Sequence, residues 1–497
     1  MWLDDVIGVF SPAAGARRKF ARFQMEQADA LARGYDAAKT GRRTDGWISP
    51  SSSADSEIGP QMARIRDRAR DLVRNNPYAA KAKNDYANYV IGSGMTPLFR
   101  MEETDRQKYK DVWNAFQDEA DASGLEPYSG IQALVAGAEF ESGECFIRFR
   151  NRLSSDRLYV PLQLEVLEAD YLDTSKDGVM NGTNRIIQGI EYDALNRRVA
   201  YWMHRDHPGN MSRFSSLTST RVPAEDVVHV FSQRRPGQGR GVSAFAPVAL
   251  KMFDLAGYED AELVRKKITA CYVAFVTQMG SSVSPLSPDS KQPMDPVTGD
   301  RKEKMKPGMV GYLRPGEEVK FGNPPSDTGF REYMNTELHA VAAGLFTTFE
   351  LMTGDLSQVN YSSMRGGMLA FRRGIERIQY NLYVHRLIKR VEKRLHQTAF
   401  IAGKIPDPNG KIIWTPPPMD MVDPLKDTQA EVLAIRNGLQ SWRTAVTRQG
   451  YDPDDVLEEI QQSNAAFDAK NITVDSDPRV TNQAGAAQAA VQSDNHA

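Results

Sequence analysis

The spacing of hydrophobic residues changes from helical to strand-like within the first half of the chain. Apolar positions recur at helical spacing over residues 61–92, where Asn75-Asn76-Pro77 predicts a break and a helix restart, and over residues 104–142 as two helices. Apolar and polar residues then alternate in GECFIRFR (143–150), LYVPLQLEVL (158–167), RIIQGIEYD (185–193) and RVAYWMH (198–204). These runs predict the strands of one antiparallel sheet, and DVVHVFS (226–232) closes an α+β region.

The second half is predicted to be mainly helical. A helix is expected near residues 243–268, with Ser243 as its N-cap and Pro247 in its first turn. Residues 278–307 are rich in proline and glycine and predict a loop or insertion, followed by the strand-like runs MVGYL and EVKFG. A helix over 329–346 and a polar segment over 347–361 precede the longest helix, expected at 362–400. That helix would be about 60 Å long at 1.5 Å per residue.

The ends of the chain are predicted to be less regular. Residues 1–60 mix basic residues with an SPSSSADS run and favour a mobile arm. Two small helices are expected near 426–437 and 453–469, and the polar residues after 470 favour disorder.

Composition limits the class of protein without identifying it. The 497 residues are 41% hydrophobic and 25% charged, which is typical of a folded chain, and the net charge of −2 excludes a globally basic nucleic-acid coat. Cys145 and Cys271 are too few for a disulfide framework. No window approaches about 20 consecutive apolar residues, so no membrane span is expected.

A glycine-rich turn, Gly237-Gln-Gly-Arg-Gly241, is the strongest candidate for a ligand site. Residues 239–244 formally match GxGxxA between a strand and a helix, the arrangement that holds a pyrophosphate in dinucleotide-binding folds. The acidic residues about 20 positions later, Glu259, Asp260 and Glu262, still lie in the predicted helix, and no second βαβ unit follows. The sequence therefore favours a turn that redirects the chain, with a nucleotide site as the alternative.

Other candidate chemistry is weaker. Residues 241–245 lack the second glycine of a nucleophile elbow, and no P-loop is present. The corner His204–His207 has ligand-type side chains but no matching distant pair, which favours a solvated loop. Asp170, Asp173 and Asp177 lack the spacing of a calcium loop. Arginines and lysines on the long helix favour a solvated face, with a contact to subunits or phosphate as the alternative.

Four stretches, in order, resemble the lambda-like family of tailed-phage portal proteins. They are VPLQLEVLEADYLDT, GIEYDALNRRVAYWMHRDHPGN, VPAEDVVHVFSQRRPGQGRGVSAFAPVALKMFDLAGYEDAELVRKKITACYVAFV and VNYSSMRGGMLAFRRGIERIQ. The resemblance extends from about residue 61 to residue 418, and it is weak in the arm and the tail.

The resemblance implies an α+β, mainly helical, wedge-shaped subunit. Its parts would be an arm (1–60), an α+β wing (61–242), stem helix 1 (243–271), a clip (272–328), stem helix 2 (329–346), a tunnel loop (347–361), a long wing helix and return (362–418), a crown (419–470) and a disordered tail (471–497). Two helices around a turn-rich insertion would make a poor enzyme core but a reasonable wedge in a ring, where a neighbour covers exposed apolar faces.

The resemblance also implies a function without catalysis or cofactors. Portals are rings of about twelve copies at one capsid vertex that conduct double-stranded DNA non-specifically during packaging and ejection. Expected partners are the terminase large subunit, head-completion and tail adaptor proteins, the major capsid protein, and a scaffold or protease, in the virion and, during assembly, the host cytoplasm.

The expected surfaces can be assigned to residues. DNA would pass the tunnel loop and stem, at Thr347, Thr348, Gln358, Asn360, Lys266, Lys267 and Lys320. Partners would contact the clip, at Lys291, Asp295, Arg301 and Lys302. Two alternatives stay open: a nucleotide-dependent DNA-processing enzyme that uses the Gly237–Gly241 turn, and a capsid or tail adaptor without a channel.

Overall fold

The computed structural model describes residues 49–210, 218–270, 274–277, 310–313, 329–419, 423–472 and 474, and a few isolated positions before residue 49. The chain divides into two units, Met1–Ser53 and Ala54–Ala497. The second unit is α+β and mainly helical, as predicted. Within the described residues, no helix combines the length and the apolar character needed to cross a membrane.

Four helices build the first part of the second unit. They are α3 (Ala54–Asn75), α4 (Pro77–Val90), α5 (Glu103–Glu119) and α6 (Tyr128–Ser142). The predicted break between the first two is confirmed, because the Asn76 side chain caps α4 and Pro77 occupies its first turn. Helix α3 starts at Ala54, earlier than the helical pattern that the sequence predicted from residue 61. Its first turn carries Asp55 and Glu57, which suit the positive end of a helix dipole.

The strands form two main sheets, where the sequence predicted one. The first has the order β3–β2–β9 and the second the order β4–β5–β6–β7–β8, and all their neighbouring strands are antiparallel. Their bounds are β2 (Glu144–Asn151), β3 (Leu162–Glu168), β4 (Val179–Asn181), β5 (Asn184–Ile187), β6 (Ile190–Tyr192), β7 (Arg198–His204), β8 (Ser219–Pro223) and β9 (Val227–Phe231).

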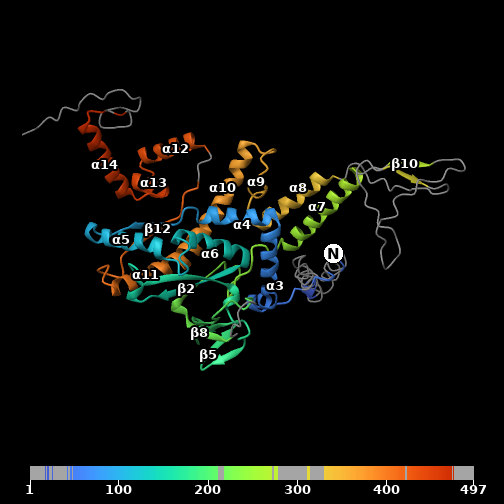
Figure 1. The fold of residues 1–497 in the computed structure, drawn as a ribbon, viewed down its shortest axis with the longest axis horizontal. Helices are drawn as coiled ribbons and strands as arrows, with labels where there is room; N and C mark the ends of the chain where they lie inside the picture. The colour runs from blue at the N-terminus through green and yellow to red at the C-terminus, as the bar shows by residue number, and fades with distance from the viewer. Residues whose placement is uncertain are drawn as a thin grey trace, which may run out of the picture. The chain divides into compact units, whose positions relative to one another are not determined.

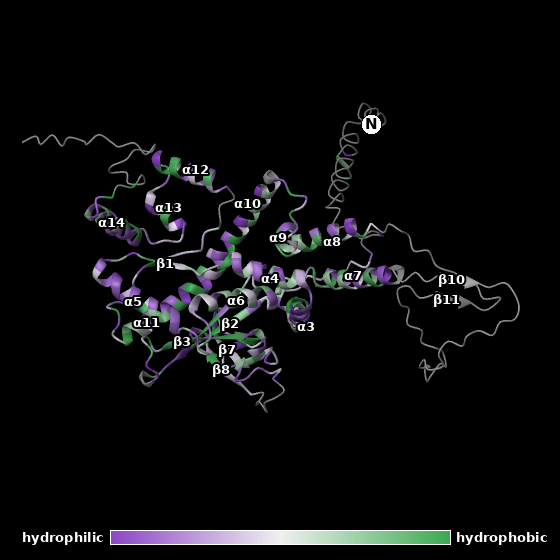
Figure 2. Cartoon of the chain, turned by 45° about the horizontal axis from the view of Figure 1, so that its top comes forward, coloured by the Kyte–Doolittle hydropathy of each residue, from purple (hydrophilic) through white to green (hydrophobic). Residues whose placement is uncertain are grey.

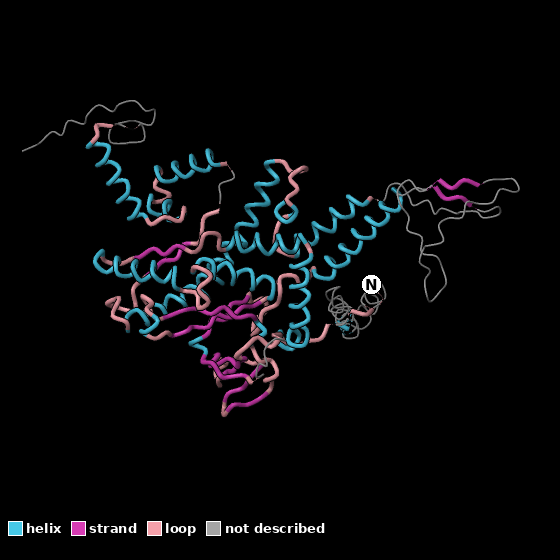
Figure 3. Tube along the Cα trace, in the orientation of Figure 1, coloured by secondary structure: helices cyan, strands magenta, loops and turns pink. Residues whose placement is uncertain are grey.

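The prediction of a single sheet was wrong because strand pairing is not local. β9 pairs with β2 from about 80 residues away, so β2 has strands on both edges and the later hairpins pair with each other instead. Figure 3 shows the strands of both sheets gathered in one region, with most of the helices above them in this view. A separate antiparallel pair joins β1 (Thr96–Phe99), which follows α4, to β12 (Ile412–Thr415), which comes late in the chain.

Helices α7 (Ala249–Ala270) and α8 (Phe330–Gly344) run side by side away from the sheets (Figure 1). The predicted start of α7 at Ser243 was wrong. The Ser243 hydroxyl accepts a hydrogen bond from the Phe245 amide at 3.1 Å, so it closes a local turn of the chain and does not cap α7. Beyond the pair, β10 (Ala274–Thr277) and β11 (Val310–Leu313) pair in parallel. β11 matches the strand expected at MVGYL, β10 was not predicted, and EVKFG lies outside the described residues.

The long helix is continuous from Tyr361 to Ile401 but changes its winding. It comprises α10 (Tyr361–Ile378), the π-helical stretch η5 (Gln379–Ile388) and α11 (Lys389–Ile401). The Gln379 side-chain amide donates to the carbonyl oxygens of Tyr89 and Val90 at the end of α4, at 3.1 and 3.0 Å. Three helices follow, α12 (Pro424–Arg436), α13 (Trp442–Arg448) and α14 (Pro453–Ala469), of which α13 was not predicted.

The buried side chains form three clusters. The first joins α5, α6, β2, β3 and the long helix, the second joins α3, α4, α7, α8 and the short helix after α8, and the third lies between the two sheets. Figure 2 shows that α7 carries hydrophobic as well as hydrophilic colour along its length.

Candidate functional site

The glycine-rich turn holds a buried ion pair. Arg240 is 1% exposed, and its guanidinium donates through Nε to both carboxylate oxygens of Glu144 at 3.0 Å and through Nη2 to the same group. Its Nη1 donates to the Gln188 carbonyl oxygen at 3.2 Å. Glu144 opens β2, so this pair joins the turn to the three-stranded sheet.

The glycines of the turn allow it to approach β2 closely enough for this ion pair. A Cβ on Gly241 would collide with the backbone of Gly143, so the two segments approach closely only because neither residue carries a side chain there. The Gly241 amide donates to Glu144 at 3.0 Å, and the Gly239 amide donates to the Asp55 carboxylate at 2.7 Å. Both amides are therefore bonded to carboxylates of the protein, which favours the structural interpretation of the turn over a pyrophosphate site.

His229 completes the cluster in its neutral form. Its Nε2 lies 3.0 Å from a Glu144 oxygen, and its Nδ1 lies 3.3 Å from the Arg198 guanidinium, which can only donate. This arrangement fits a ring that is protonated at Nε2 alone. Burial lowers the pKa of His229 to about 4. Burial by itself would raise the pKa of Glu144, but Arg240 and His229 outweigh it and hold that pKa well below its usual range.

Sequence reasoning missed this cluster. Local pattern gave no signal for it, because Glu144 lies at a polar position of an alternating strand and Arg240 stands between two glycines of a predicted turn. The pairing itself spans 96 residues, and no local pattern indicates it.

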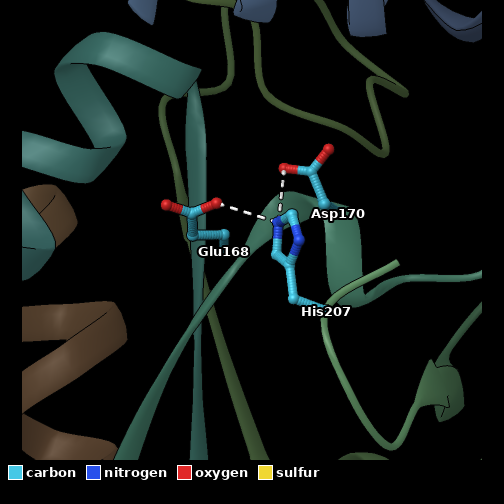
Figure 4. Close-up of side chains that lie close together, drawn as sticks. All are labelled: Glu168, Asp170 and His207. Atoms are coloured by element: carbon cyan, nitrogen blue, oxygen red, sulfur yellow. Dashed lines mark hydrogen bonds and ion pairs between the residues drawn. The ribbon is translucent and has the colours of Figure 1, made fainter. Parts of the chain in front are cut away.

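A second group brings together Glu168, Asp170 and His207 (Figure 4). Its three ligand-type atoms lie within 4.8 Å of one another, and His207 Nε2 is 3.1 Å from Glu168. The prediction that the His204–His207 corner has no distant ligand pair was therefore wrong. Two guanidinium groups from α3 already neutralise the carboxylates, however: Arg66 lies 2.8 Å from Asp170, and Arg70 lies 2.8 and 2.7 Å from Glu168 and Asp170. This environment suits an ion-pair network that fastens α3 to the sheet rather than a cation.

Arginines on the long helix bind the protein's own backbone. Arg386 donates to the Phe231 carbonyl at 2.9 Å, Arg390 donates to the Ala224 and Val227 carbonyls, and Arg394 pairs with Asp226 at 2.8 Å. These three side chains, spaced four residues apart, fasten the helix to β9 and the turn before it. The solvated face that we predicted for the helix is confirmed for its exposed basic residues, Arg373, Arg377, Lys389, Arg390 and Lys393, whereas the half-buried Arg386 and Arg394 bond within the chain.

The segment 347–361 is more regular than a loop. Phe349–Thr353 form the short helix α9, capped by the Thr348 hydroxyl at 3.3 Å from the Leu351 amide and ended by Gly354 at φ 75°. Met352 is fully buried, and the Phe349 ring stacks on His339 of α8 at 4.1 Å between centroids. Asn360 caps α10 through a 2.8 Å bond from the Ser363 amide.

The predicted DNA-facing residues fall into two kinds. Thr348 and Asn360 have capping roles within the chain, whereas Gln358 is exposed and Thr347 is half-buried. Lys266 and Lys267 are exposed near the far end of α7, with Lys266 3.8 Å from Glu262 and over the Phe330 ring. Lys320 and the four predicted clip residues, Lys291, Asp295, Arg301 and Lys302, lie outside the described residues.

Comparison with known proteins gives a consistent result. The family described as phage portal protein, lambda family, matches residues 40–379. The chain is 26% identical over 457 residues to a probable portal protein of Halomonas phage phiHAP-1, covering 88% of this chain and 87% of the relative. It is 23% identical to the portal protein of Escherichia phage N15, covering 85% and 88%, and 23% identical to portal protein B of Escherichia phage lambda, covering 83% and 85%.

Solved structures with a similar chain come from gene transfer agent particles. A chain of the virion of the native particle has a TM-score of 0.41 at 15% identity, covering 79% of this chain and 94% of that chain. A chain of the neck of the native particle, computed with C12 symmetry, has a TM-score of 0.39 at 15% identity, covering 78% and 94%.

Proposed function

This chain belongs to the lambda family of phage portal proteins, and from that premise we propose that its copies close into a ring of about twelve at one capsid vertex. The family match over residues 40–379 carries this proposal. The ring conducts double-stranded DNA into the capsid during packaging and out of it during ejection. It is part of the virion, and it assembles in the host cytoplasm.

The expected surfaces follow the order of the elements. The pair α7 and α8 forms the stem, residues 272–328 between them form the clip, and the segment 347–361 faces the channel. The clip docks the terminase large subunit during packaging and head-completion or tail adaptor proteins afterwards. Contacts with the major capsid protein and with a scaffold or protease accompany assembly of the head.

Contact with the passing DNA is weak and independent of sequence. Each phosphate that a protein neutralises adds salt-dependent affinity, so a channel that gripped DNA would not conduct it. The exposed Lys266 and Lys267 share the end of α7 with Glu259, Asp260 and Glu262, which limits the local positive charge.

Ring formation is tested on the purified full-length chain by light scattering after size exclusion and by negative-stain imaging. We expect closed rings with a central hole and no nucleotide-dependent change in mass. A chain that stays monomeric at high concentration would overturn the proposal, and a monomer or dimer that binds nucleotide would favour the enzyme alternative. A particle without a central hole would favour the adaptor alternative.

A further inference from the structure

A cleft of about 660 Å³ lies between the β1–β12 pair and the helices α13 and α14. One wall comes from β1, β12 and the start of α5, and the other comes from α13 and the first turn of α14, which Figure 1 shows on opposite sides of this space. Clefts of this volume hold small ligands or parts of larger ones. None of the residues that we assigned to DNA contact lines it. We refer to it as the α13 cleft.

Positive charge dominates the lining of the α13 cleft. Its guanidinium groups are those of Arg100, Arg106, Arg443 and Arg448, and its one carboxylate is that of Asp454. Asp454 accepts from Arg106 at 2.8 Å and from Arg443 at 2.7 Å, so these bonds join α5 and α13 to α14. Two further carboxylates lie close by and serve the same two arginines, because Glu103 pairs with Arg106 and Asp452 lies near Arg443.

The other two guanidinium groups have no acidic partner. Among the described residues, the Arg100 side chain makes no hydrogen bond or ion pair, and Arg448 donates only to the neutral side-chain oxygen of Gln440, at 3.2 Å. Both arginines are exposed, one at the end of β1 and the other on α13. Uncompensated charge of one sign in a concave site raises the local concentration of the opposite ion.

A hydroxyl donor lies in the same lining. Ser441 and Thr444 bond to each other through their hydroxyl groups at 2.7 Å, which uses one hydroxyl proton and leaves the other free to donate. Guanidinium groups together with hydroxyl donors are the side chains that proteins use for phosphate oxygens.

A neighbouring cleft shows that this excess of charge is local. It has about 640 Å³ and shares Tyr380, Thr415 and Arg448 with the α13 cleft. Its other charged side chains are nearly balanced in number: Arg365, Arg372, Arg373, Glu376, Asp427 and Glu431. Two clefts of similar volume on the same elements therefore differ in charge, and only the α13 cleft has the character of an anion site.

We propose that the α13 cleft binds a phosphate group, held by Arg100 from one wall and by Arg448 with the Ser441–Thr444 hydroxyls from the other. A planar guanidinium can direct two N–H groups at two oxygens of one phosphate, which favours this anion over a halide. The phosphate belongs either to the backbone of DNA or to a small phosphate compound. Binding here does not require ring formation, so it is tested separately from the proposed function.

The first experiment compares two double variants of the full-length chain that remove the same charge. Arg100→Gln with Arg448→Gln changes the α13 cleft, whereas Arg373→Gln with Arg377→Gln changes two exposed arginines of α10. Calorimetry measures the affinity for pyrophosphate, and fluorescence anisotropy measures the affinity for a short labelled DNA duplex. We expect the first variant to lose about tenfold in affinity and the second about twofold or less.

The two probes distinguish the sources of the phosphate. A loss for both probes supports a site for the DNA backbone, and a loss for pyrophosphate alone supports a site for small phosphate compounds. Unchanged affinity in the first variant, or an equal loss in both variants, would overturn the proposal. A chain that forms no rings but shows the expected loss would contradict the proposed function and support the phosphate site.

The second experiment uses the unchanged chain. Phenylglyoxal modifies accessible guanidinium groups, and mass spectrometry after digestion reports the extent at each arginine. We expect pyrophosphate to protect Arg100 and Arg448 and to leave the modification of Arg373 unchanged. Protection of all three to the same extent, or of none, would overturn the proposal.

Discussion

At the scale of single residues, the structure depends on a charged cluster that the chain buries completely. Glu144 and Arg240 are each about 1% exposed and bonded to each other and to backbone groups. A buried pair of this kind adds little net stability over apolar side chains, but removing one partner leaves an uncompensated charge. The cluster therefore acts mainly to fix how the turn at 237–241 meets β2.

We predict that Glu144→Gln destabilises the chain by about 3–5 kcal/mol, because Arg240 then stays buried without a counter-charge. The matched control is Glu165→Gln on the neighbouring strand β3, where the pair with Arg150 is 34% exposed on both sides and worth less than about 1 kcal/mol. Thermal unfolding of both variants measures the difference. Equal losses in the two variants would contradict the prediction.

At the scale of elements, segment 347–361 combines internal structure with an exposed part. α9 is held by Met352 and Phe349, whereas residues 356–358 are exposed between Gly354 and the cap of α10. We therefore expect the segment to contact DNA through the few residues before α10.

We predict that Gln358→Asp combined with Asn360→Asp leaves ring assembly normal but reduces DNA packaging or retention. Aspartate caps a helix as well as asparagine does, so α10 keeps its start, while the added negative charges repel the passing backbone. The measure is the DNA content of heads produced with the variant.

The control for that experiment is Gln358→Ser combined with Asn360→Ser, which keeps a capping hydroxyl and adds no charge. It should package DNA like the wild type. Wild-type DNA content in the aspartate variant would show that the segment does not face the DNA.

At the scale of the whole molecule, two buried histidines link stability to pH. Burial lowers the pKa of His229 and of His396 to about 4. In the unfolded chain both titrate near their usual pKa of about 6.5, so between these values the unfolded state binds more protons. Stability is thus fully present above about pH 6.5 and is lost as the pH falls towards 4. Glu139 and Glu392, whose pKa values burial raises, act in the opposite direction.

We predict that the unfolding free energy of the wild type falls more steeply than that of His229→Gln between pH 6.5 and 4, by about 1.4 kcal/mol per pH unit. Glutamine keeps a donor for Glu144 but takes up no proton. The control is His385→Gln, an exposed histidine on the long helix, which should follow the wild type. Melting temperatures across the pH range provide the comparison, and parallel curves for the wild type and His229→Gln would contradict the assignment.

The sequence by itself determined most elements and the family. Helix periodicity and capping residues such as Asn76-Pro77 act within a few positions, so most of the longer helices were predicted to within several residues, whereas the short helices α9 and α13 were not predicted. Ordered resemblance over most of the chain indicated a portal protein, and the family match agrees. The late start of α7 was missed, because the Ser243 hydroxyl bonds the Phe245 amide in a local turn instead of capping the helix.

Only the tertiary structure decided what lies together across long stretches of chain. The pairing of β9 with β2, the pairing of Glu144 with Arg240, and the bonds of Arg386 and Arg390 to backbone carbonyls all join residues about 80 or more positions apart. Local pattern shows that a position prefers burial or carries charge, but not which partner satisfies it. The same holds for Leu250 and Phe253 of α7, whose spacing can be read from the sequence, while their exposure follows only from the way α8 packs on the other face of the helix.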